Sequence, residues 1–505
     1  MLFFEAQLLR FKRLISEHAS VLVWILSLAC LSVGARNFEE GLSLDASLYA
    51  TIARNIARSG QYFLLDGQVP EFRIFAEHPH LGFWIQALIY KVLPIADWST
   101  RIQGHIFYLL FMFLFFRVSH SLFSLRTSVL AVLFLWVWPV FSNFFSSFYL
   151  DPGCLVFGSL FLVAYAKGLG LSFDKGRSDW VLSSRSRRSW VFLSLVSGLF
   201  LGLAFMQKGM TALGFGPVAA VLLALALLRG TRVERRRIVV GTLLSLGVCM
   251  LVLTAYYGAI LRSAVPQFLD IYWSRQFSNR FSKGTSFAEL FSAKFWGRLK
   301  DDTLQMLWLL APALYLLRRS WKASLLPFAF FASFVLLYGL NRRIGAQYWL
   351  MIMPGLALIL AAAADLVLNR FPRAPQAPIL MRATQMLAIS ALMLVQYLPT
   401  STHHVRRPPQ SPFLQQLQES QGYRDLVVIG KRLDFVFAAS FAWYADYRVH
   451  YLTPKHFLSQ LHNNNLASFE TPAVYLLLDP ELRKTSLAPP QGYCKTEDLL
   501  HPCSK

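Results

Sequence analysis

The sequence predicts a mainly α-helical protein that crosses a membrane many times and carries a small α/β domain at its C-terminal end. The chain of 505 residues is 55% hydrophobic and 15% aromatic, and its mean hydropathy is +0.45. Such values are typical of polytopic membrane proteins and rare in soluble domains. Long apolar runs recur before residue 400, and basic residues concentrate in the short loops between them.

The apolar runs define the predicted membrane spans. A spanning helix needs roughly 20 mostly apolar residues. We predict about eleven spans on this criterion. They lie near residues 19–35, 101–117, 127–147, 152–168, 190–206, 210–228, 238–261, 303–317, 323–340, 345–364 and 383–399. The first run lacks a small-residue cleavage site, so we expect a retained span and not a cleaved signal peptide.

The net charge of +22 has two possible explanations. In a soluble protein it would suggest nucleic-acid binding. Here the Lys and Arg residues lie in short loops between apolar runs, which fits the positive-inside rule and attraction to anionic lipid headgroups. We therefore expect membrane lipids, and no nucleic acid, as partners of these basic loops, and we expect a cytoplasmic N-terminus.

The apolar stretch 81–94 decides the orientation of the chain. It is short, contains Lys91 and ends at Pro94. If it spanned the membrane, the most basic loops would move to the outer side, against the positive-inside rule. We therefore predict an interfacial helix. Residues 36–100 then form one long extracytoplasmic loop with helices on the membrane surface, and residues 262–302 form a second large outer loop.

The C-terminal part has a different composition. The segments "DLVVIG" (425–430) and "AVYLLL" (473–478) predict short buried strands. We therefore predict two domains, a membrane domain of residues 1–399 and an extracytoplasmic α/β domain of residues 400–505.

The five cysteines fall into two groups. Cys30, Cys154 and Cys249 lie inside apolar runs and are expected to be small buried side chains. Cys494 and Cys503 lie near the C-terminus, where a disulfide is plausible in an oxidising compartment. Their spacing does not resemble that of a zinc site.

Several ionisable side chains fall on the predicted outer side of the membrane. Asp45 opens the first outer loop and His78 lies near its end, Asp151 follows the third span, and Lys208 lies in the tight loop "QKG". Arg342 and Arg343 follow in "NRRIGAQYW". We expect these side chains, from four separate loops, to converge on one external site.

Each of these residues also has a structural explanation. Asp45 and Asp151 stand where helices begin, so both could be helix caps. Lys208 could extend its ammonium to the membrane surface, although a positive charge on the outer side opposes the charge rule and calls for a reason. His78 and His80 could belong to a turn around Pro79, because two histidines alone do not complete a metal site.

Taken together, the motifs resemble a known family over about residues 20–365. The segments that carry the resemblance are Asp45 and Tyr49 in "LDASLYATIARNIARSGQY", then "HPHLGFWIQALIY", "FSSFYLDPGCLVF", "LGLAFMQKG" and "RRIGAQYWLMIMPGLALIL". In this order and spacing they resemble the GT-C membrane glycosyltransferases. They are similar to the bacterial proteins related to protein O-mannosyltransferases and to lipid A aminoarabinose transferases. The chain departs from the pattern at Ala46, where many relatives have an acid, and at His80 in "HPHL".

The resemblance implies a GT-C fold and an inverting transfer of a sugar from a polyprenyl-phosphate donor. The implied acceptor is lipid A or another lipid, a glycan or a protein outside the cytoplasm. Asp45 and Asp151 are the expected catalytic carboxylates, with Asp45 as general base. The expected donor- and phosphate-binding residues are Tyr49, Lys208, His78, Arg275, Arg280, Arg342 and Arg343.

The resemblance also gives further expectations. Trp84 is expected to line a groove for the prenyl chain. No cofactor is certain; if a divalent metal ion takes part, Asp45, Asp151 and His78 are the candidate ligands. The expected location is a bacterial inner membrane with the active site on the periplasmic side. The alternatives are a polyprenyl-lipid transporter or flippase and a non-catalytic envelope assembly factor.

Overall fold

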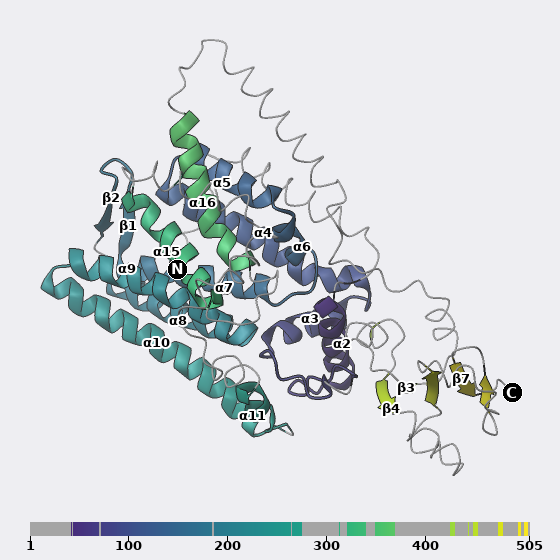
Figure 1. The fold of residues 1–505 in the computed structure, drawn as a ribbon. Coiled ribbons are helices and arrows are strands. Elements are labelled where there is room, and N and C mark those ends of the chain that lie inside the picture. The colour runs from purple at the N-terminus through teal and green to yellow at the C-terminus, as the bar shows by residue number, and fades with distance from the viewer. Residues whose placement is uncertain are drawn as a thin grey trace. The chain divides into compact units, whose positions relative to one another are not determined.

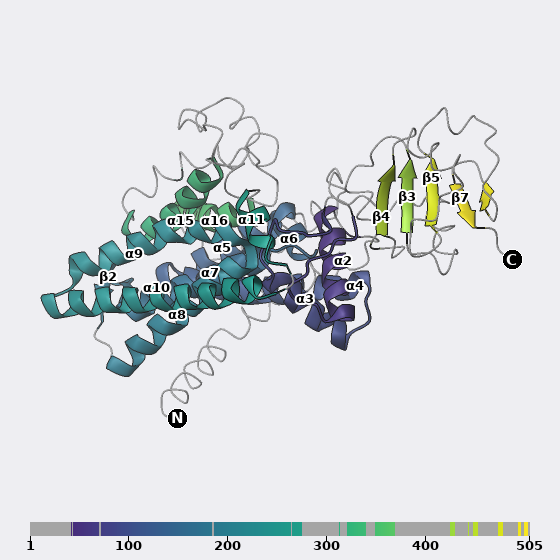
Figure 2. The same cartoon turned by 90° about the horizontal axis from the view of Figure 1, so that it is seen from below.

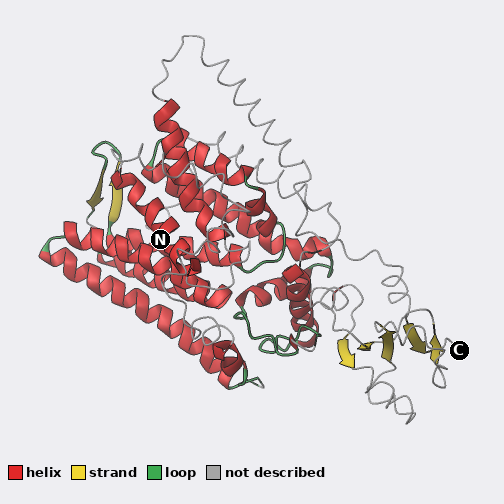
Figure 3. Cartoon of the chain, in the orientation of Figure 1, coloured by secondary structure: helices red, strands yellow, loops and turns green. Residues whose placement is uncertain are grey.

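The structure is a computed structural model, and it describes part of the 505 residues. The described residues are 42, 44–69, 72–183, 186–263, 265–274, 313, 321–339, 349–368, 425–429, 443, 448–452, 473–477, 493–495 and 499–502. Most of them are helical (Figure 3). They fall into two compact units, which we treat separately. Unit 1 contains residues within 101–262 and 270–401, and unit 2 contains residues within 40–100, 263–269 and 402–505.

Unit 1 is a bundle of long apolar helices. Its elements are α4 (Asp97–Leu122, which begins in unit 2), α5 (Leu125–Val137), α6 (Pro139–Phe145), α7 (Asp151–Leu169), α8 (Arg187–Lys208), the 3₁₀ helix η2 (Gly209–Gly214), α9 (Phe215–Arg229), α10 (Arg232–Leu261), α15 (Trp321–Gly339) and α16 (Trp349–Leu368). The short helix α11 (Phe268–Trp273) follows α10. Helix α8 packs along both α7 and α10, and α16 packs on α15 and α5 (Figure 1).

Six stretches of the described residues are long and apolar enough to cross a membrane: Asp97–Leu122, Asp151–Leu169, Arg187–Arg229, Arg232–Leu261, Trp321–Tyr338 and Trp349–Val367. They coincide with predicted spans, and the continuous stretch Arg187–Arg229 contains two of them. The predicted spans 19–35, 303–317 and 383–399 lie wholly or almost wholly outside the described residues.

The predicted span 127–147 is divided. Helix α5 ends at Val137 and α6 begins at Pro139, and Trp138 between them has an extended conformation with ψ near 108°. The break follows from the proline, because a residue that precedes proline is pushed out of the helical region. The apolar composition alone does not reveal the division.

The basic loop 167–189 contains a small hairpin. Strands β1 (Leu171–Asp174) and β2 (Asp179–Leu182) pair in antiparallel fashion. Asp179 lies within 2.6 Å of an Arg229 guanidinium nitrogen and 3.0 Å of the Lys322 ammonium. These hydrogen bonds to Arg229 and Lys322 lower the pKa of Asp179 well below its usual value. The hairpin is thereby joined to the ends of α9 and α15.

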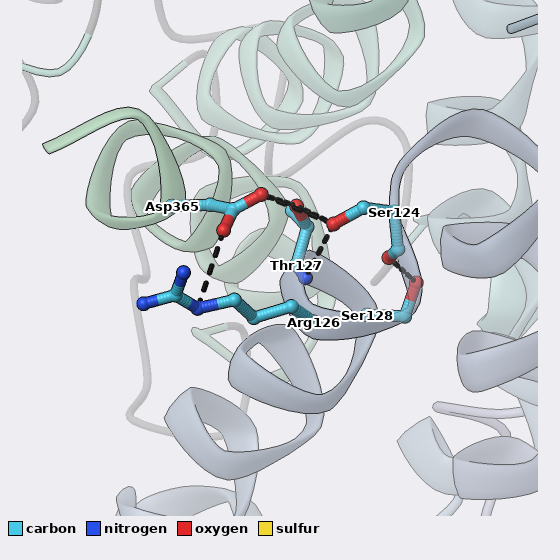
Figure 4. Close-up of polar contacts among 5 residues, drawn as sticks. All are labelled: Ser124, Arg126, Thr127, Ser128 and Asp365. Atoms are coloured by element: carbon cyan, nitrogen blue, oxygen red, sulfur yellow. Dashed lines mark hydrogen bonds and ion pairs between the residues drawn. The ribbon is translucent and has the colours of Figure 1, made fainter. Parts of the chain in front are cut away.

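A polar cluster joins α16 to the start of α5 (Figure 4). Asp365 on α16 accepts hydrogen bonds from the hydroxyls of Thr127 (2.7 Å) and Ser124 (3.0 Å). The Arg126 guanidinium lies 3.4 Å from its other carboxylate oxygen. Ser124 is the N-cap of α5 and also accepts from the Thr127 backbone N–H. A buried carboxylate with three partners fixes the register of two helices far apart in sequence.

Replacing Asp365 by Ala is expected to destabilise the protein by about 1.5–3 kcal/mol, because hydrogen bonds to a charged group in a buried site are lost. Thermal unfolding of the purified protein in detergent measures the change. The control is Arg177→Ala, which breaks an ion pair of 3.7 Å whose arginine side chain is 81% exposed. Its expected effect is below about 0.5 kcal/mol. An equal shift for both variants would contradict the anchoring role of Asp365.

Unit 2 combines two helices with a β-sheet. The helices are α2 (Leu44–Ser59) and α3 (Leu81–Val92), which pack on each other. With 12 residues, α3 is too short to span a bilayer. The stretch 81–94 is therefore a short helix as expected, and its place at the membrane interface stays a prediction. Leu88 and Val92 on α3 are exposed, as expected for a helix that meets lipid on one side.

The sheet has five strands in the order β4-β3-β5-β7-β6 (Figure 2). They are β3 (Asp425–Ile429), β4 (Arg448–Leu452), β5 (Ala473–Leu477), β6 (Tyr493–Lys495) and β7 (Leu499–Pro502). The central strand β3 is parallel to both β4 and β5. Its continuous apolar sequence and its buried Leu426 and Val427 are typical of a strand covered on both faces. Both predicted strands of the C-terminal region are thus confirmed.

The cysteines agree with prediction where they are described. Cys154 and Cys249 are free and buried. Strand β6 carries Cys494 opposite His501 on β7. Cys503 and Cys30 lie outside the described residues, so the disulfide between Cys494 and Cys503 stays a prediction.

Candidate active site

Unit 2 brings three predicted site residues together at the start of α2. Asp45 lies in the first turn of the helix and is partly exposed. Tyr49 follows one turn later and is buried. Its ring meets that of His78 edge-on with centroids 6.0 Å apart, and it packs in the same way on Phe75 and Phe83. The carboxylate, the phenol and the imidazole therefore belong to one local cluster.

Helix α2, which carries Asp45, is hydrogen-bonded to the loop that follows it. Asn55 donates to the Asp66 carbonyl oxygen at 2.9 Å, and the loop that follows is closed by the hydrogen bond from Phe75 N to Leu65 O at 2.7 Å. Helix α2 begins at Leu44, so Asp45 is inside its first turn and not at the cap. A carboxylate there also interacts favourably with the helix dipole. The position is compatible with a well-oriented base.

Arg54 explains why α2 contains a buried arginine. Its guanidinium donates to the Trp443 carbonyl oxygen at 3.0 Å and to Gln68 at 2.8 Å, and it lies 5.4 Å from the centre of the Trp443 ring. The Trp443 indole N–H in turn donates to Asp97 at 2.9 Å. A residue of the C-terminal region therefore anchors the helix of Asp45. Sequence reasoning did not identify Arg54 or Trp443, because the contact joins segments 389 positions apart.

His80 and Trp84 form the other side of this unit. His80 is fully buried between Phe63, Trp84 and Phe268, and its Nε2–H donates to the Phe63 carbonyl oxygen at 3.1 Å. The Trp84 indole N–H donates to the Tyr62 carbonyl oxygen at 2.6 Å. These bonds fix the turn around Pro79. His80 is a structural residue here, and the role of Trp84 in a lipid groove stays a prediction.

Burial lowers the pKa of His80 from 6.5 to about 4, so its imidazole is neutral at pH 7. The pKa of His80 is lower in the folded state than in the unfolded state. Its contribution to the free energy of unfolding is therefore fully present above about pH 6.5 and decreases as the pH drops toward 4. The expected loss by pH 4 is about 3 kcal/mol. Thermal unfolding of wild type and His80→Gln between pH 4 and pH 7.5 measures it. The variant keeps an N–H donor and is expected to show a flatter pH profile; identical profiles would contradict the assignment.

Unit 1 contains a second cluster, built on an ion pair between Asp151 and Lys208. The Lys208 ammonium donates to Oδ2 of Asp151, and both side chains are almost completely buried. Asp151 is the first residue of α7, yet the N-cap is Leu150 and makes no side-chain cap. Lys208 is the last residue of α8. The structure thus pairs the two residues, whereas capping and snorkelling would have separated them.

The backbone around Lys208 explains how its charge stays buried. Gly209 has φ 58° and ψ −124°, a conformation that favours glycine. It ends α8 and starts η2 directly, so the Lys208 side chain points back at the start of α7. Because a buried charge needs a partner of opposite sign, Asp151 and Lys208 depend on each other.

The structure does not describe the predicted phosphate-binding arginines, and it gives no metal cluster among the residues that it describes. Arg275, Arg280, Arg342 and Arg343 are outside the described residues. In the part of the chain that the structure describes, no three His, Cys, Asp or Glu side chains gather as a metal site. The ammonium of Lys208 on Asp151 also disfavours a divalent cation at that carboxylate. The possible ligand set Asp45, Asp151 and His78 stays a prediction.

Comparisons with known proteins fit the motifs and the helices. Residues 77–255 match the family model described as "Dolichyl-phosphate-mannose-protein mannosyltransferase". The solved structure of apo ArnT from Cupriavidus metallidurans is similar with a TM-score of 0.66 at 13% identity, covering 96% of this chain and 98% of that chain. The fold is the GT-C fold.

Two further solved structures are similar to this chain. The structure of the same ArnT bound to undecaprenyl phosphate is similar with a TM-score of 0.65 at 13% identity, over 95% of this chain and 97% of that chain. An archaeal oligosaccharyltransferase, AglB from Archaeoglobus fulgidus, matches with a TM-score of 0.49 at 11% identity, covering 90% of this chain and 69% of that chain. No curated protein sequence matches. The fold that the resemblance predicted is confirmed, and the chain is a multi-pass membrane protein with the GT-C fold.

Proposed function

We propose that this protein is an integral-membrane glycosyltransferase that moves a sugar from a polyprenyl-phosphate donor to an acceptor outside the cytoplasm. The observation that carries the proposal is the nearly full-length similarity to the ArnT structure that holds undecaprenyl phosphate. The family model over residues 77–255 supports the same reaction class. The buried ion pair and the partly exposed Asp45 supply the kinds of group that such a reaction needs.

The reaction is a single displacement at the anomeric carbon. An acceptor hydroxyl or amine attacks that carbon, the bond from the carbon to the phosphate oxygen breaks, and polyprenyl phosphate leaves with the bonding electrons. The configuration is inverted. We assign Asp45 as the general base that takes the acceptor proton, because a carboxylate at the first turn of α2 is partly open to solvent and fixed by the helix.

The leaving phosphate needs positive charge that is in place before the reaction. We assign Lys208 to this role. The ion pair with Asp151 holds the ammonium in one place, so the lysine needs no reorganisation when the donor binds. Tyr49 and His78 are proposed donor contacts beside Asp45. Arg275, Arg280, Arg342 and Arg343 remain proposed phosphate ligands, and Trp84 remains a proposed contact of the prenyl chain.

The acceptor is proposed to be lipid A, another envelope glycan or lipid, or a protein, on the periplasmic side of a bacterial inner membrane. The charge distribution across the predicted loops supports the orientation, with the N-terminus in the cytoplasm. The sheet of unit 2 and the two outer loops are the proposed region of acceptor selection.

Two measurements test the function. Mass spectrometry of lipids and envelope glycans from cells that lack the gene is expected to show one glycan without its sugar. Purified full-length protein is then expected to release polyprenyl phosphate from the matching donor only when the acceptor is present. An unchanged glycan profile, or movement of the lipid across vesicle membranes without sugar transfer, would overturn the proposal and favour a transporter.

A further inference from the structure

Gln207 is a buried amide next to the ion pair. It directly precedes Lys208 on α8 and is completely buried. Within the described part of the chain, neither its amide nitrogen nor its amide oxygen has a hydrogen-bond partner. Buried polar groups are nearly always paired, and leaving both atoms of one amide unpaired costs free energy. A buried amide that lowers the free energy of unfolding in this way requires an explanation.

The amide of Gln207 fits here because its neighbour on α7, Gly153, has no side chain. A Cβ atom on Gly153 would lie 2.5 Å from the Gln207 amide nitrogen and 2.6 Å from its Cδ. Gly153 follows Asp151 by two residues on α7, and the ring of Phe107 on α4 lies against the same point, 2.8 Å from that Cβ position. The amide is therefore packed against the first turn of α7, the same turn that carries Asp151.

The chemistry of the unpaired atoms restricts what they could bind. An amide offers two N–H donors and one oxygen acceptor. Oδ1 of Asp151 is a further buried acceptor without a partner among the described residues. A phosphate group supplies acceptors only, so it would leave the Gln207 oxygen and Asp151 Oδ1 unpaired. A hydroxyl group is both a donor and an acceptor, so hydroxyl groups can pair with the Gln207 amide nitrogen, with its oxygen and with Oδ1 of Asp151.

We propose that Gln207 is a specificity-determining residue that hydrogen-bonds a hydroxyl or amino substituent of the donor sugar, with Oδ1 of Asp151 accepting a hydrogen bond from the same sugar. The proposal rests on the proposed function, and it deepens it by assigning the sugar and not the phosphate to this amide. Sequence reasoning passed over Gln207 inside "LGLAFMQKG", because an amide in an apolar helix gives no signal by itself.

The decisive variant is Gln207→Met, which keeps the length of the side chain and removes its polar atoms. The probes are undecaprenyl-phosphate mannose, undecaprenyl-phosphate aminoarabinose and sugar-free undecaprenyl phosphate, added to the full-length protein in detergent. For the sugar donor that binds the wild type, the variant is expected to raise Kd and KM about 10-fold or more, because a site built to pair a hydroxyl loses its partner. Its Kd for undecaprenyl phosphate is expected to stay within about 2-fold, since the phosphate is assigned to the Lys208 ammonium and not to this amide.

Ligand-free thermal unfolding separates recognition from packing. If Gln207 awaits a ligand, Gln207→Met is expected to melt at the wild-type temperature or above it, because an unpaired buried amide is removed. The matched control is Gln86→Met, which removes a buried glutamine whose amide nitrogen donates to the Ser99 carbonyl oxygen at 3.1 Å. It is expected to lower the melting temperature and leave the Kd of the sugar donor unchanged.

Two results would overturn the proposal. In the first, Gln207→Met melts below the wild type as Gln86→Met does and binds the sugar donor normally, which makes Gln207 a packing residue. In the second, it weakens the sugar-free phosphate as much as the sugar donor, which assigns it to the phosphate. Because binding is measured without turnover, a wild type that binds sugar donors but transfers none would sink the proposed function and leave this inference testable.

Discussion

Asp45→Asn is expected to lower the rate constant of sugar transfer by about 10²–10⁴-fold, the usual contribution of a general base. Asparagine has nearly the same shape as aspartate and keeps the hydrogen-bonding oxygen, but it cannot take a proton at neutral pH. The KM for the donor is expected to change little, because the carboxylate acts on the acceptor. The measurement is the rate of transfer by purified protein at saturating donor.

The control for this variant is Asp174→Asn in the β1–β2 hairpin of unit 1. The Asp174 side chain is partly exposed, and it accepts a hydrogen bond from the Gly176 backbone N–H within the hairpin turn. We therefore expect Asp174→Asn to transfer sugar at the wild-type rate. Asp45→Asn must also melt within a few degrees of the wild type, since Asp45 is at the first turn of α2 and a lost dipole interaction costs only about 0.3–1 kcal/mol. Transfer by Asp45→Asn at the wild-type rate would end the general-base assignment.

The second large effect is expected at Lys208. Lys208→Met leaves the Asp151 carboxylate buried without its counter-ion, and breaking a buried pair from one side costs about 3–5 kcal/mol. Transfer is expected to be lost as well, because the cation next to the donor phosphate is gone. Unfolding in detergent and donor-dependent turnover are measured on the same preparation.

A double variant separates folding from catalysis. Asp151→Asn combined with Lys208→Met removes both charges, and replacing a whole buried pair by neutral side chains is often close to neutral for stability. We expect the double variant to regain most of the lost stability and to stay inactive. The control Lys91→Met removes an exposed lysine that donates to the Tyr62 hydroxyl at 2.6 Å and is expected to cost less than about 1 kcal/mol. If the double variant recovers activity together with stability, Lys208 has no role beyond folding.

Local composition predicted most of the architecture. A bilayer requires every backbone N–H and C=O to be paired within its own segment, so each long apolar run had to be a helix wherever it spans. Helices α4, α7, α8, α9, α10, α15 and α16 follow from that requirement. The short helix at 81–94 followed from length and charge, and strands β3 and β5 followed from their continuous apolar sequences.

Composition did not predict where a helix breaks. The division of 127–147 at Trp138 depends on the backbone preference imposed by Pro139, a local effect that hydropathy averages away. The β1–β2 hairpin was hidden for a similar reason, since a basic loop gives no apolar pattern for its two short strands.

For the candidate site, the sequence supplied the residues and the resemblance supplied their roles. Asp45 and Tyr49 lie one turn apart on α2, and the Tyr49 ring meets that of His78; their roles stay predictions. Asp151 and Lys208, in contrast, were each explained equally well by capping or snorkelling until their pairing was seen. Gln207 and Arg54 carried no signal at all, because an amide or a guanidinium in an apolar helix has no meaning until its surroundings are known.

The sequence alone predicted a polytopic membrane protein and the spans that the described helices contain, since both depend on the free energy of transferring each segment between water and lipid. The orientation of the charged loops stays a prediction from the positive-inside rule. Only the tertiary structure decided that Lys208 finds Asp151, 57 positions away, that Arg54 finds Trp443, 389 positions away, and that Thr127 finds Asp365, 238 positions away. The physical reason is that burial makes a charge depend on one particular partner, and which partner is available is fixed by how helices pack and not by the residues on either side.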